Sequence, residues 1–120
     1  MTDPVRGDRP NIVFINTDEQ SATMMRCAGN AYLTTPAMDR LAAEGMRFGR
    51  AYCTHPVCLP SRFSFFTGRL PSELDIWDNK SGRHVEAPRH MLDHCAGQLL
   101  KRAGYRVAYG GKVHLPPGMT

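Results

Sequence analysis

The stretch RPNIVFINTDEQ, residues 9–20, decides which fold class the chain is expected to adopt. Its run NIVFIN, Asn11 to Asn16, is continuously apolar at its centre and rich in β-branched residues, a pattern typical of a parallel strand that is buried on both faces. The apolar run ends abruptly in a polar turn that contains Asp18 and Glu19. We therefore expect a buried strand with two acidic residues at its carboxyl end.

The segments that follow this strand alternate between helical and strand patterns. Thr35 suits a helix N-cap, Pro36 the first helical position and Gly45 the stop, which predicts a short amphipathic helix. The rest is assigned from periodicity and from the breaks at proline and glycine. Helices are predicted over residues 36–44, 61–68 and 91–104, and strands over residues 11–16, 46–52 and 105–109.

This order of elements indicates an α/β fold with a mainly parallel sheet flanked by helices. In such sheets the ligand crevice lies beyond the carboxyl ends of the strands. Three polar clusters fall there, TDEQ (17–20), CLPSR (58–62) and GKVH (111–114), and we expect them to converge on one rim of the sheet. Residues 70–88 are expected to form a surface loop anchored by Trp77.

Composition narrows the classes of protein to which the chain can belong. The 120 residues, 42% hydrophobic and 22% charged, are typical of one globular domain or a piece of one. The net charge of +4 comes from scattered basic residues, so no nucleic-acid partner is expected. No window has the roughly 18 apolar residues of a membrane span, and the polar start lacks a signal-peptide pattern. We expect a cytoplasmic location, and reduced thiols at Cys27, Cys53, Cys58 and Cys95.

The acidic pair after the first strand is the first candidate site. Adjacent carboxylates repel each other, and they are stable together when they are solvated or share a cation. Asp18 and Glu19 offer the hard oxygen ligands that calcium or magnesium prefers. The alternative is a pair of acids at a helix N-terminus.

Cys58 is the second candidate, since it lies just ahead of a predicted helix whose N-terminus favours an anion. A buried structural cysteine is the ordinary alternative. Cys53 and His55 nearby suggest zinc, but no second pair of ligands occurs at zinc-finger spacing.

Lys112 and His114 are the third candidate. They stand two residues apart after a Gly-Gly exit, so in an extended segment both side chains would point to the same side. A cation and a proton carrier that face one cleft suit an oxyanion substrate whose leaving group needs a proton. The alternative is a surface lysine and a solvated histidine.

Taken together, these stretches resemble the N-terminal part of the type I sulfatases, which have an alkaline-phosphatase-like fold. The similar stretches are RPNIVFINTDEQ, TTPAMDRLAAEGMRFGRAYCTHPVCLPSRFSFFTGR and GYRVAYGGKVHL, and they cover most of residues 9–115. The most specific element is CLPSR followed by TGR. In the family, C-x-P-x-R marks the cysteine that is oxidised to formylglycine.

The resemblance implies a role for each candidate residue. Cys58 becomes an aldehyde whose hydrate has two hydroxyls on one carbon, one to attack sulfur and one to expel sulfate. Arg62 holds that hydrate, Lys112 binds the sulfate oxygens and His114 acts as base. Asp18 and Glu19, with the modified Cys58, begin a divalent-metal site, usually calcium, with magnesium or manganese as alternatives.

The sequence departs from the family pattern at three positions. Glu19 stands where Asp is frequent, Val113 where Trp is frequent and Pro116 where Gly is frequent. The latter two are expected to affect the substrate walls more than the chemistry. The family's remaining metal ligands and leaving-group residues lie beyond the G-K-x-H motif. We therefore expect residues 1–120 to be the N-terminal portion of a sulfatase catalytic domain that is inactive alone.

The first hypothesis for function is a sulfuric ester hydrolase that acts on a sulfated small molecule or saccharide, with a formylglycine-generating enzyme as maturation partner. One alternative is a phosphonate or phosphate ester hydrolase that uses the same aldehyde. Another, from a different class, is a zinc-stabilised binding module with Cys53, Cys58 and histidines as ligands.

Overall fold

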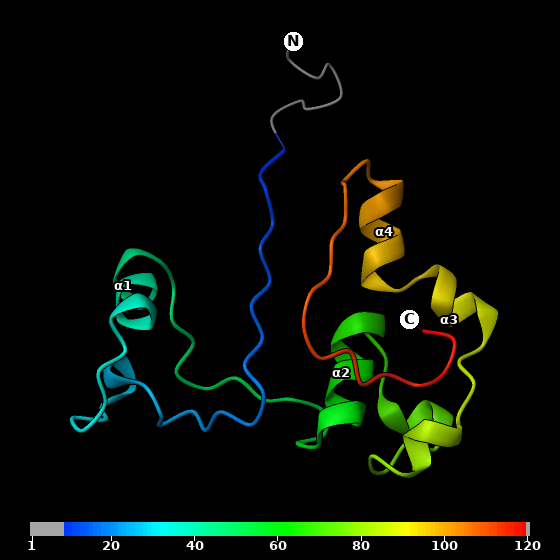
Figure 1. Ribbon diagram of the computed structural model, residues 1–120, viewed down its shortest axis with the longest axis horizontal. Helices are drawn as coiled ribbons and strands as arrows, with labels where there is room; N and C mark the ends of the chain where they lie inside the picture. The colour runs from blue at the N-terminus through cyan, green and yellow to red at the C-terminus, as the bar shows by residue number, and fades with distance from the viewer. Residues whose placement is uncertain (1–8, 120) are drawn as a thin grey trace. The chain divides into compact units, whose positions relative to one another are not determined.

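The computed structural model describes residues 9–119, which fall into two compact units. Unit 1 combines residues 9–13 with 53–119, and unit 2 consists of residues 14–52. Figure 1 shows the helices, where η denotes a 3-10 helix. Unit 2 contains η1 (Arg26–Ala28) and α1 (Pro36–Glu44), and unit 1 contains α2 (Cys58–Thr67), η2 (Pro71–Leu74), η3 (Ser81–His84), α3 (Arg89–Asp93) and α4 (Ala96–Arg102).

Unit 2 is organised around the carboxylate of Asp39 in the first turn of α1. Its Oδ1 atom accepts hydrogen bonds from the backbone N–H of Cys27 at 2.8 Å and from the hydroxyl of Thr35 at 3.0 Å. Partial desolvation raises the pKa of Asp39, but these hydrogen bonds and the charge of Arg26 outweigh it and bring the pKa below its usual value. The bonds therefore join η1 to the start of α1.

The predicted helix over residues 36–44 is confirmed with its expected ends. Pro36 is the first residue of α1, and the backbone N–H of Gly45 closes the last turn on the carbonyl of Leu41. The Thr35 hydroxyl, expected to cap the helix backbone, instead bonds the Asp39 side chain and accepts from the N–H of Arg26 at 2.9 Å.

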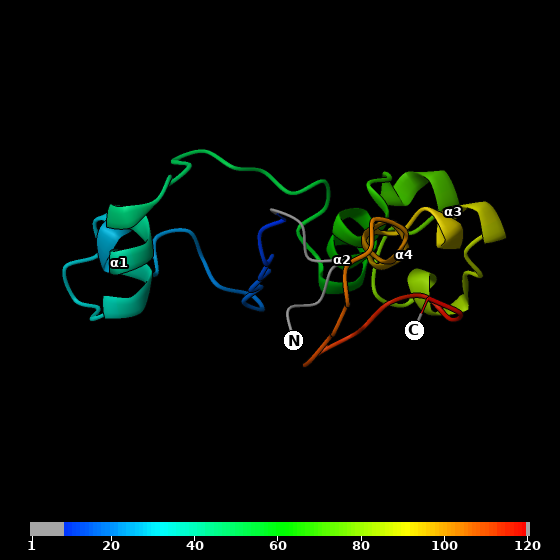
Figure 2. The ribbon, with the colours of Figure 1, turned by 90° about the horizontal axis from the view of Figure 1, so that it is seen from above.

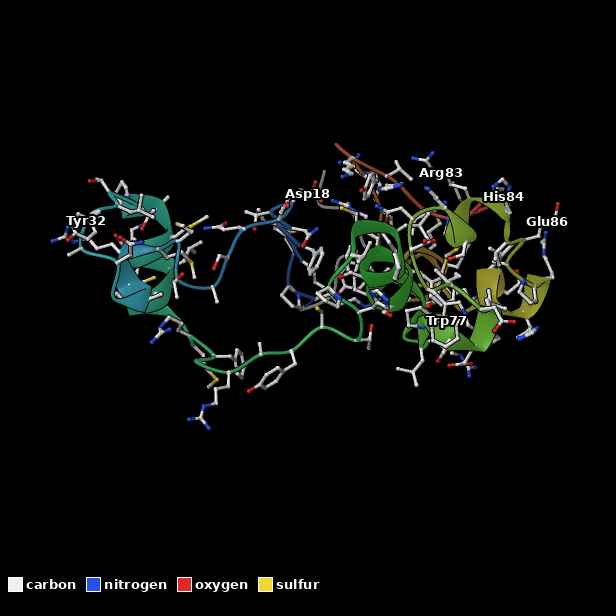
Figure 3. The ribbon with its side chains drawn as sticks, turned by 90° about the horizontal axis from the view of Figure 1, so that it is seen from below. Asp18, Tyr32, Trp77, Arg83, His84 and Glu86 are labelled. Atoms are coloured by element: carbon white, nitrogen blue, oxygen red, sulfur yellow. The ribbon has the colours of Figure 1, made fainter. Side chains whose placement is uncertain are left out.

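The core of unit 1 lies between α2 and the chain that follows it. Leu59, Phe63, Ile76 and Met91 are buried, and Leu74, Val85 and Met119 pack against them. Helix α2 packs against α4 and η2, an arrangement that Figures 1 and 2 show from two directions. The expectation that Trp77 anchors the loop is wrong: Ile76 is fully buried, while Trp77 is 59% exposed (Figure 3).

The predicted sheet does not form within residues 9–119, none of which lies in a β-strand. The segments expected as strands, 11–16, 46–52 and 105–109, run without ladder hydrogen bonds. A strand exists only when a neighbour pairs its backbone groups, and periodicity does not reveal whether a neighbour is present. In consequence Ile12, Val13, Phe14 and Ile15 are 59–79% exposed.

Two predicted helices have different bounds from those expected. Helix α2 begins at Cys58 instead of Ser61, because Pro60 falls in the first turn, where its missing N–H has no helical partner to lose. The helix expected over 91–104 is broken into α3 and α4 at His94 and Cys95, where Cys95 is extended. None of the helices in residues 9–119 combines the length and apolar content that crossing a membrane requires.

Candidate active site

Cys58 is the first residue of α2, so its side chain lies at the positive end of the helix dipole. The preceding residue, Val57, is extended, and its carbonyl accepts the N–H of Ser61 at 2.9 Å. The backbone N–H of Leu59 donates to the Oδ1 atom of Asn79 at 2.9 Å, which satisfies one free donor of the first turn. Cys58 is half-buried in a setting that favours an anionic side chain.

Arg62 follows Cys58 by four residues on α2, so both side chains project from the same face of the helix. Arg62 is only 5% exposed, which is rare for a charged side chain unless it has polar partners. Its Nη1 atom donates to the backbone carbonyl of Lys112 at 2.5 Å and to the Tyr109 hydroxyl at 3.5 Å. The structure thus joins two of the three predicted clusters, CLPSR and GKVH.

The GKVH segment is a bent loop instead of the extended segment expected from the sequence. Gly111 has φ +99° and His114 has φ +46°, both in the left-handed region. For a non-glycine residue this conformation is uncommon and is found most often where surrounding contacts hold it. The Lys112 side chain is exposed, whereas both ring nitrogens of His114 are buried. The bend means that the alternation rule for extended chains does not apply to this pair.

Asp18 and Glu19 lie in unit 2, so their predicted convergence with the other clusters stays a prediction. Glu19 is exposed and has φ +57°, which places a left-handed turn directly after the apolar run. Within residues 9–119 no three His, Cys, Asp or Glu side chains form a group that could hold a metal ion. The two carboxylates match a hard cation in chemistry but do not form a complete site among the described residues.

The four cysteines are all free thiols. Cys53 is exposed, His55 is half-buried, and the His55 Nδ1 atom is buried without a hydrogen-bond partner among the described residues. The absence of a three-ligand group in that part of the chain gives the zinc-stabilised module no geometric support.

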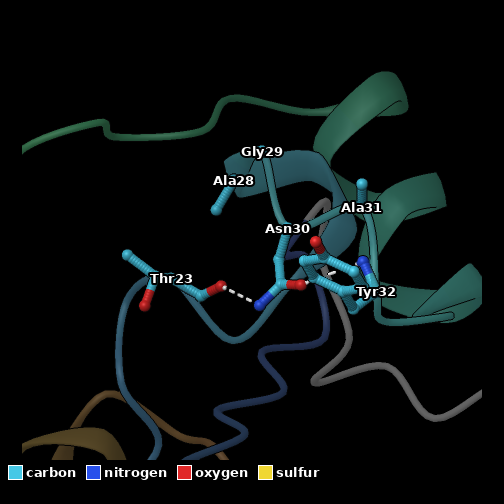
Figure 4. A pocket seen from close by; sticks show the side chains of 6 residues that line it. All are labelled: Thr23, Ala28, Gly29, Asn30, Ala31 and Tyr32. Atoms are coloured by element: carbon cyan, nitrogen blue, oxygen red, sulfur yellow. Dashed lines mark hydrogen bonds between the residues drawn. The ribbon is translucent and has the colours of Figure 1, made fainter.

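Unit 2 contains an open pocket of about 350 Å³ beside η1 (Figure 4). Asn30 shapes its wall by donating to the carbonyl of Thr23 at 3.1 Å. The pocket is lined by Thr23, Ala28, Gly29, Asn30, Ala31 and Tyr32. None of the predicted site residues lines it.

Sequence reasoning missed two residues that contact the site. Asn79 caps the first turn of α2 from a loop twenty residues away, and Tyr109 donates its hydroxyl to the carbonyl of Lys112. Asn79 lies in a stretch rich in turn residues, where an asparagine carries no distinct signal. Tyr109 stands in a predicted strand, where an aromatic residue is ordinary.

Comparison with known proteins gives a consistent result over almost the whole chain. The sulfatase family model matches residues 10–118. The uncharacterized sulfatase YidJ of Escherichia coli (strain K12) is 38% identical over 109 residues, which cover 89% of this chain and 20% of that protein. The N-acetylglucosamine-6-O-sulfatase of Bacteroides thetaiotaomicron is 38% identical over 110 residues, 89% of this chain and 18% of that protein.

A mammalian sulfatase is similar to this chain to about the same extent. The N-acetylgalactosamine-6-sulfatase of Mus musculus is 36% identical over 113 residues, 88% of this chain and 22% of that protein. The chain thus spans about a fifth of the length of the curated relatives that it matches. No solved structure gives a significant match.

Proposed function

The chain belongs to the sulfatase family, and from this premise we propose that it carries the nucleophile of a sulfuric ester hydrolase. One observation carries the proposal. Arg62, the last residue of the C-x-P-x-R motif, is buried and bonds the backbone of Lys112 in the G-K-x-H motif. Two motifs that are fifty residues apart therefore meet at one guanidinium group.

The setting of Cys58 fits the formylglycine that the family implies. An aldehyde hydrate needs a polar, partly accessible position that tolerates negative charge, and the half-buried first residue of α2 provides one. Formylglycine supplies a nucleophile with two hydroxyls on one carbon. Its formation requires a maturation enzyme that recognises Cys58, Pro60 and Arg62, and we propose such an enzyme as a partner.

Arg62, Lys112 and His114 each have a separate task in this proposal. The Arg62 guanidinium, held on the helix face that it shares with position 58, offsets negative charge there. Lys112, an exposed residue, binds the anionic sulfate oxygens through its ammonium group and stabilises the charge that develops in the transition state. His114 removes a proton from the hydroxyl at position 58, a task that requires its neutral form.

Asp18 and Glu19 would hold the divalent cation. Their carboxylates are hard oxygen ligands of the kind that calcium takes, and magnesium or manganese can use the same atoms. When bound, the cation supplies positive charge for the nucleophile and the sulfate. The left-handed turn at Glu19 supports the idea that the two acids present a shaped turn instead of a regular helix start.

The proposed substrate is a sulfate monoester of a saccharide. Two of the relatives bear names that describe the removal of 6-sulfate from N-acetylhexosamines. The alkoxide of a saccharide hydroxyl is a poor leaving group. Protonation of the departing oxygen therefore matters more for a saccharide sulfate than for an aryl sulfate. Which sugar is accepted depends on groups that contact the ring.

The experiment that tests the proposal begins with Cys58. The full-length gene product is co-expressed with a formylglycine-generating enzyme, and the tryptic peptide Ala51 to Arg62 is sequenced by mass spectrometry. Position 58 alone is expected to exchange one sulfur and two hydrogens for one oxygen, while Cys53 in the same peptide stays a thiol. An unmodified Cys58 under these conditions would remove the basis of the proposal.

Activity is then measured on matched aryl sulfate and aryl phosphonate esters, with Cys58→Ala as the blank. We expect turnover of the sulfate, and its loss in the blank. A clear preference for the phosphonate would replace the proposed reaction with phosphonate ester hydrolysis by the same nucleophile. Equal rates in the converted protein and the blank would contradict both.

A further inference from the structure

Two donors from two segments meet at one carbonyl oxygen in unit 1. The Lys112 carbonyl accepts a hydrogen bond from Arg62 Nη1 at 2.5 Å and a second from the Tyr109 hydroxyl. The Tyr109 oxygen in turn accepts from Arg62 Nη1 at 3.5 Å. A carbonyl oxygen has two lone pairs, and here both have a donor. This closed set of bonds fixes the position of the peptide group that follows Lys112.

The ring of Tyr109 is held by the same helix. Its centroid lies 5.7 Å from that of Phe66, with the planes tilted by 54°, a favourable aromatic arrangement. Phe66 follows Arg62 by four residues on α2, so it lies on the same helix face. Tyr109 is 52% exposed, so its ring packs on Phe66 at the surface and is not part of the core.

The held peptide group lies between two left-handed residues, Gly111 and His114. Residues 105–115 form no strand, so no ladder of backbone bonds sets their path. The direction in which the Lys112 and His114 side chains leave the backbone depends on the orientation of the peptide group after Lys112, whose carbonyl is hydrogen-bonded to Arg62. A small rotation of that peptide would move both side chains relative to position 58.

We propose that Tyr109 is a positioning residue, which fixes the Lys112–His114 segment against Arg62 so that both side chains are held for reaction at position 58. This inference rests on the proposed function for its catalytic meaning. The hydroxyl is the part that acts, because the ring alone would still pack on Phe66. Tyr109 acts in this proposal through the Lys112 carbonyl and Arg62, with no contact of its own to the substrate.

The test compares Tyr109→Phe with Tyr105→Phe in the full-length gene product, after equal Cys58 conversion has been verified. Tyr105 is half-buried in the same segment, and among the described residues its hydroxyl makes no hydrogen bond. For Tyr109→Phe we expect kcat on an aryl sulfate to fall about fivefold, which corresponds to one net hydrogen bond. KM is expected to stay within about twofold, because a misplaced base affects the transition state more than binding.

Hydrogen exchange supplies a readout that does not depend on turnover. Peptides that cover residues 110–115 are expected to exchange faster in Tyr109→Phe than in wild type, and to be unchanged in Tyr105→Phe. Wild-type exchange in Tyr109→Phe would overturn the inference whatever the activity. Faster exchange with unchanged kcat would overturn the catalytic role. If wild type exchanges as expected but cleaves no sulfate ester, the proposed function fails, and the catalytic part of this inference fails with it.

Discussion

Arg62 combines burial, charge and a main-chain partner in a way that makes its chemistry testable by a conservative change. Both contacts come from the single Nη1 atom at the far end of the guanidinium, and lysine keeps the charge but is too short to place its nitrogen there. We expect Arg62→Lys to lower the free energy of unfolding by about 1–3 kcal/mol. Urea denaturation followed by circular dichroism measures the change.

The matched control is Arg69→Lys on an exposed arginine. Arg69 pairs with Glu73 at 3.4 Å, and its side chain is 51% exposed. A surface pair of this kind contributes between zero and about 1 kcal/mol, so the control is expected to unfold almost as wild type does. Equal losses of unfolding free energy in the two variants would mean that the Arg62 contacts stabilise the fold no more than a surface ion pair does.

Asp78 provides a pH-dependent contribution to stability. Its carboxylate accepts the backbone N–H of Ser81 at 2.7 Å and that of Lys80 at 2.9 Å. Hydrogen bonds from Ser81, and to a lesser extent Lys80, lower the pKa of Asp78 in the folded state. A lowered pKa stabilises the fold above the unfolded value of about 3.9 and loses that effect as pH falls through the folded pKa.

We therefore expect wild type to lose stability between about pH 5 and about pH 3 more steeply than Asp78→Asn, which keeps an acceptor oxygen but does not ionise. Asp75→Asn is the control, since among the described residues the Asp75 side chain accepts no hydrogen bond and asparagine tolerates its left-handed backbone. Denaturation midpoints at several pH values give the slopes. Parallel slopes for wild type and Asp78→Asn would contradict the assignment.

At the scale of elements, the sequence predicts an end best where one residue acts on its own turn of backbone. Pro36 and Gly45 bound α1 because each acts on its own turn of backbone. Pro60 predicts a break that puts Cys58 ahead of the helix, but a proline in the first turn interrupts nothing, so α2 begins at Cys58. The break at Cys95 and the burial of Ile76 in place of Trp77 depend on packing between segments, which hydrophobic spacing does not encode.

Packing between η3 and α2 leads to a prediction at Gly82. A Cβ atom at this buried glycine would lie 2.1 Å from the Cδ2 atom of Leu59, which is itself fully buried. Leu59 follows the proposed nucleophile directly, so it has little freedom to move without shifting the start of α2. We expect Gly82→Ala to lower the free energy of unfolding by about 1–3 kcal/mol, measured by urea denaturation.

Gly97→Ala is the control with the opposite sign. Gly97 lies in α4, and a Cβ atom there meets no other atom within 4 Å. Alanine has the higher helix propensity, so this variant is expected to gain up to about 1 kcal/mol. No loss of stability in Gly82→Ala would mean that the packing described between η3 and α2 is wrong. A loss in Gly97→Ala would contradict the open space described at α4.

At the scale of the whole molecule, the sequence predicts an α/β pattern, but the sheet is not formed in residues 9–119. Strand order predicts that the CLPSR and GKVH clusters meet, and the structure joins them without strands, through Arg62 and the backbone carbonyl of Lys112. The family could be inferred because motifs are local. The sheet could not be established, because each strand depends on partners that its own residues do not specify.

The exposed run from Ile12 to Ile15 has a measurable consequence. Four consecutive apolar, mostly β-branched residues without charge form a segment that pairs readily with another copy. We expect residues 1–120 to self-associate with rising concentration, and Val13→Lys to reduce this, as measured by light scattering. Tyr32→Lys, at an isolated residue that is 98% exposed, should leave it unchanged. Equal association in all three proteins would contradict this role for the run.

The acceptor that Arg62 uses on Lys112 is a main-chain carbonyl, and every amino acid carries one. Substitution at position 112 can therefore remove the ammonium group without removing the anchor for Arg62. Over evolutionary time, the side-chain charge and the backbone acceptor at position 112 can change independently. A descendant with methionine at position 112 would keep the hydrogen bond to Arg62 while losing the ammonium group. Inactive relatives that keep their fold are the expected product of such drift.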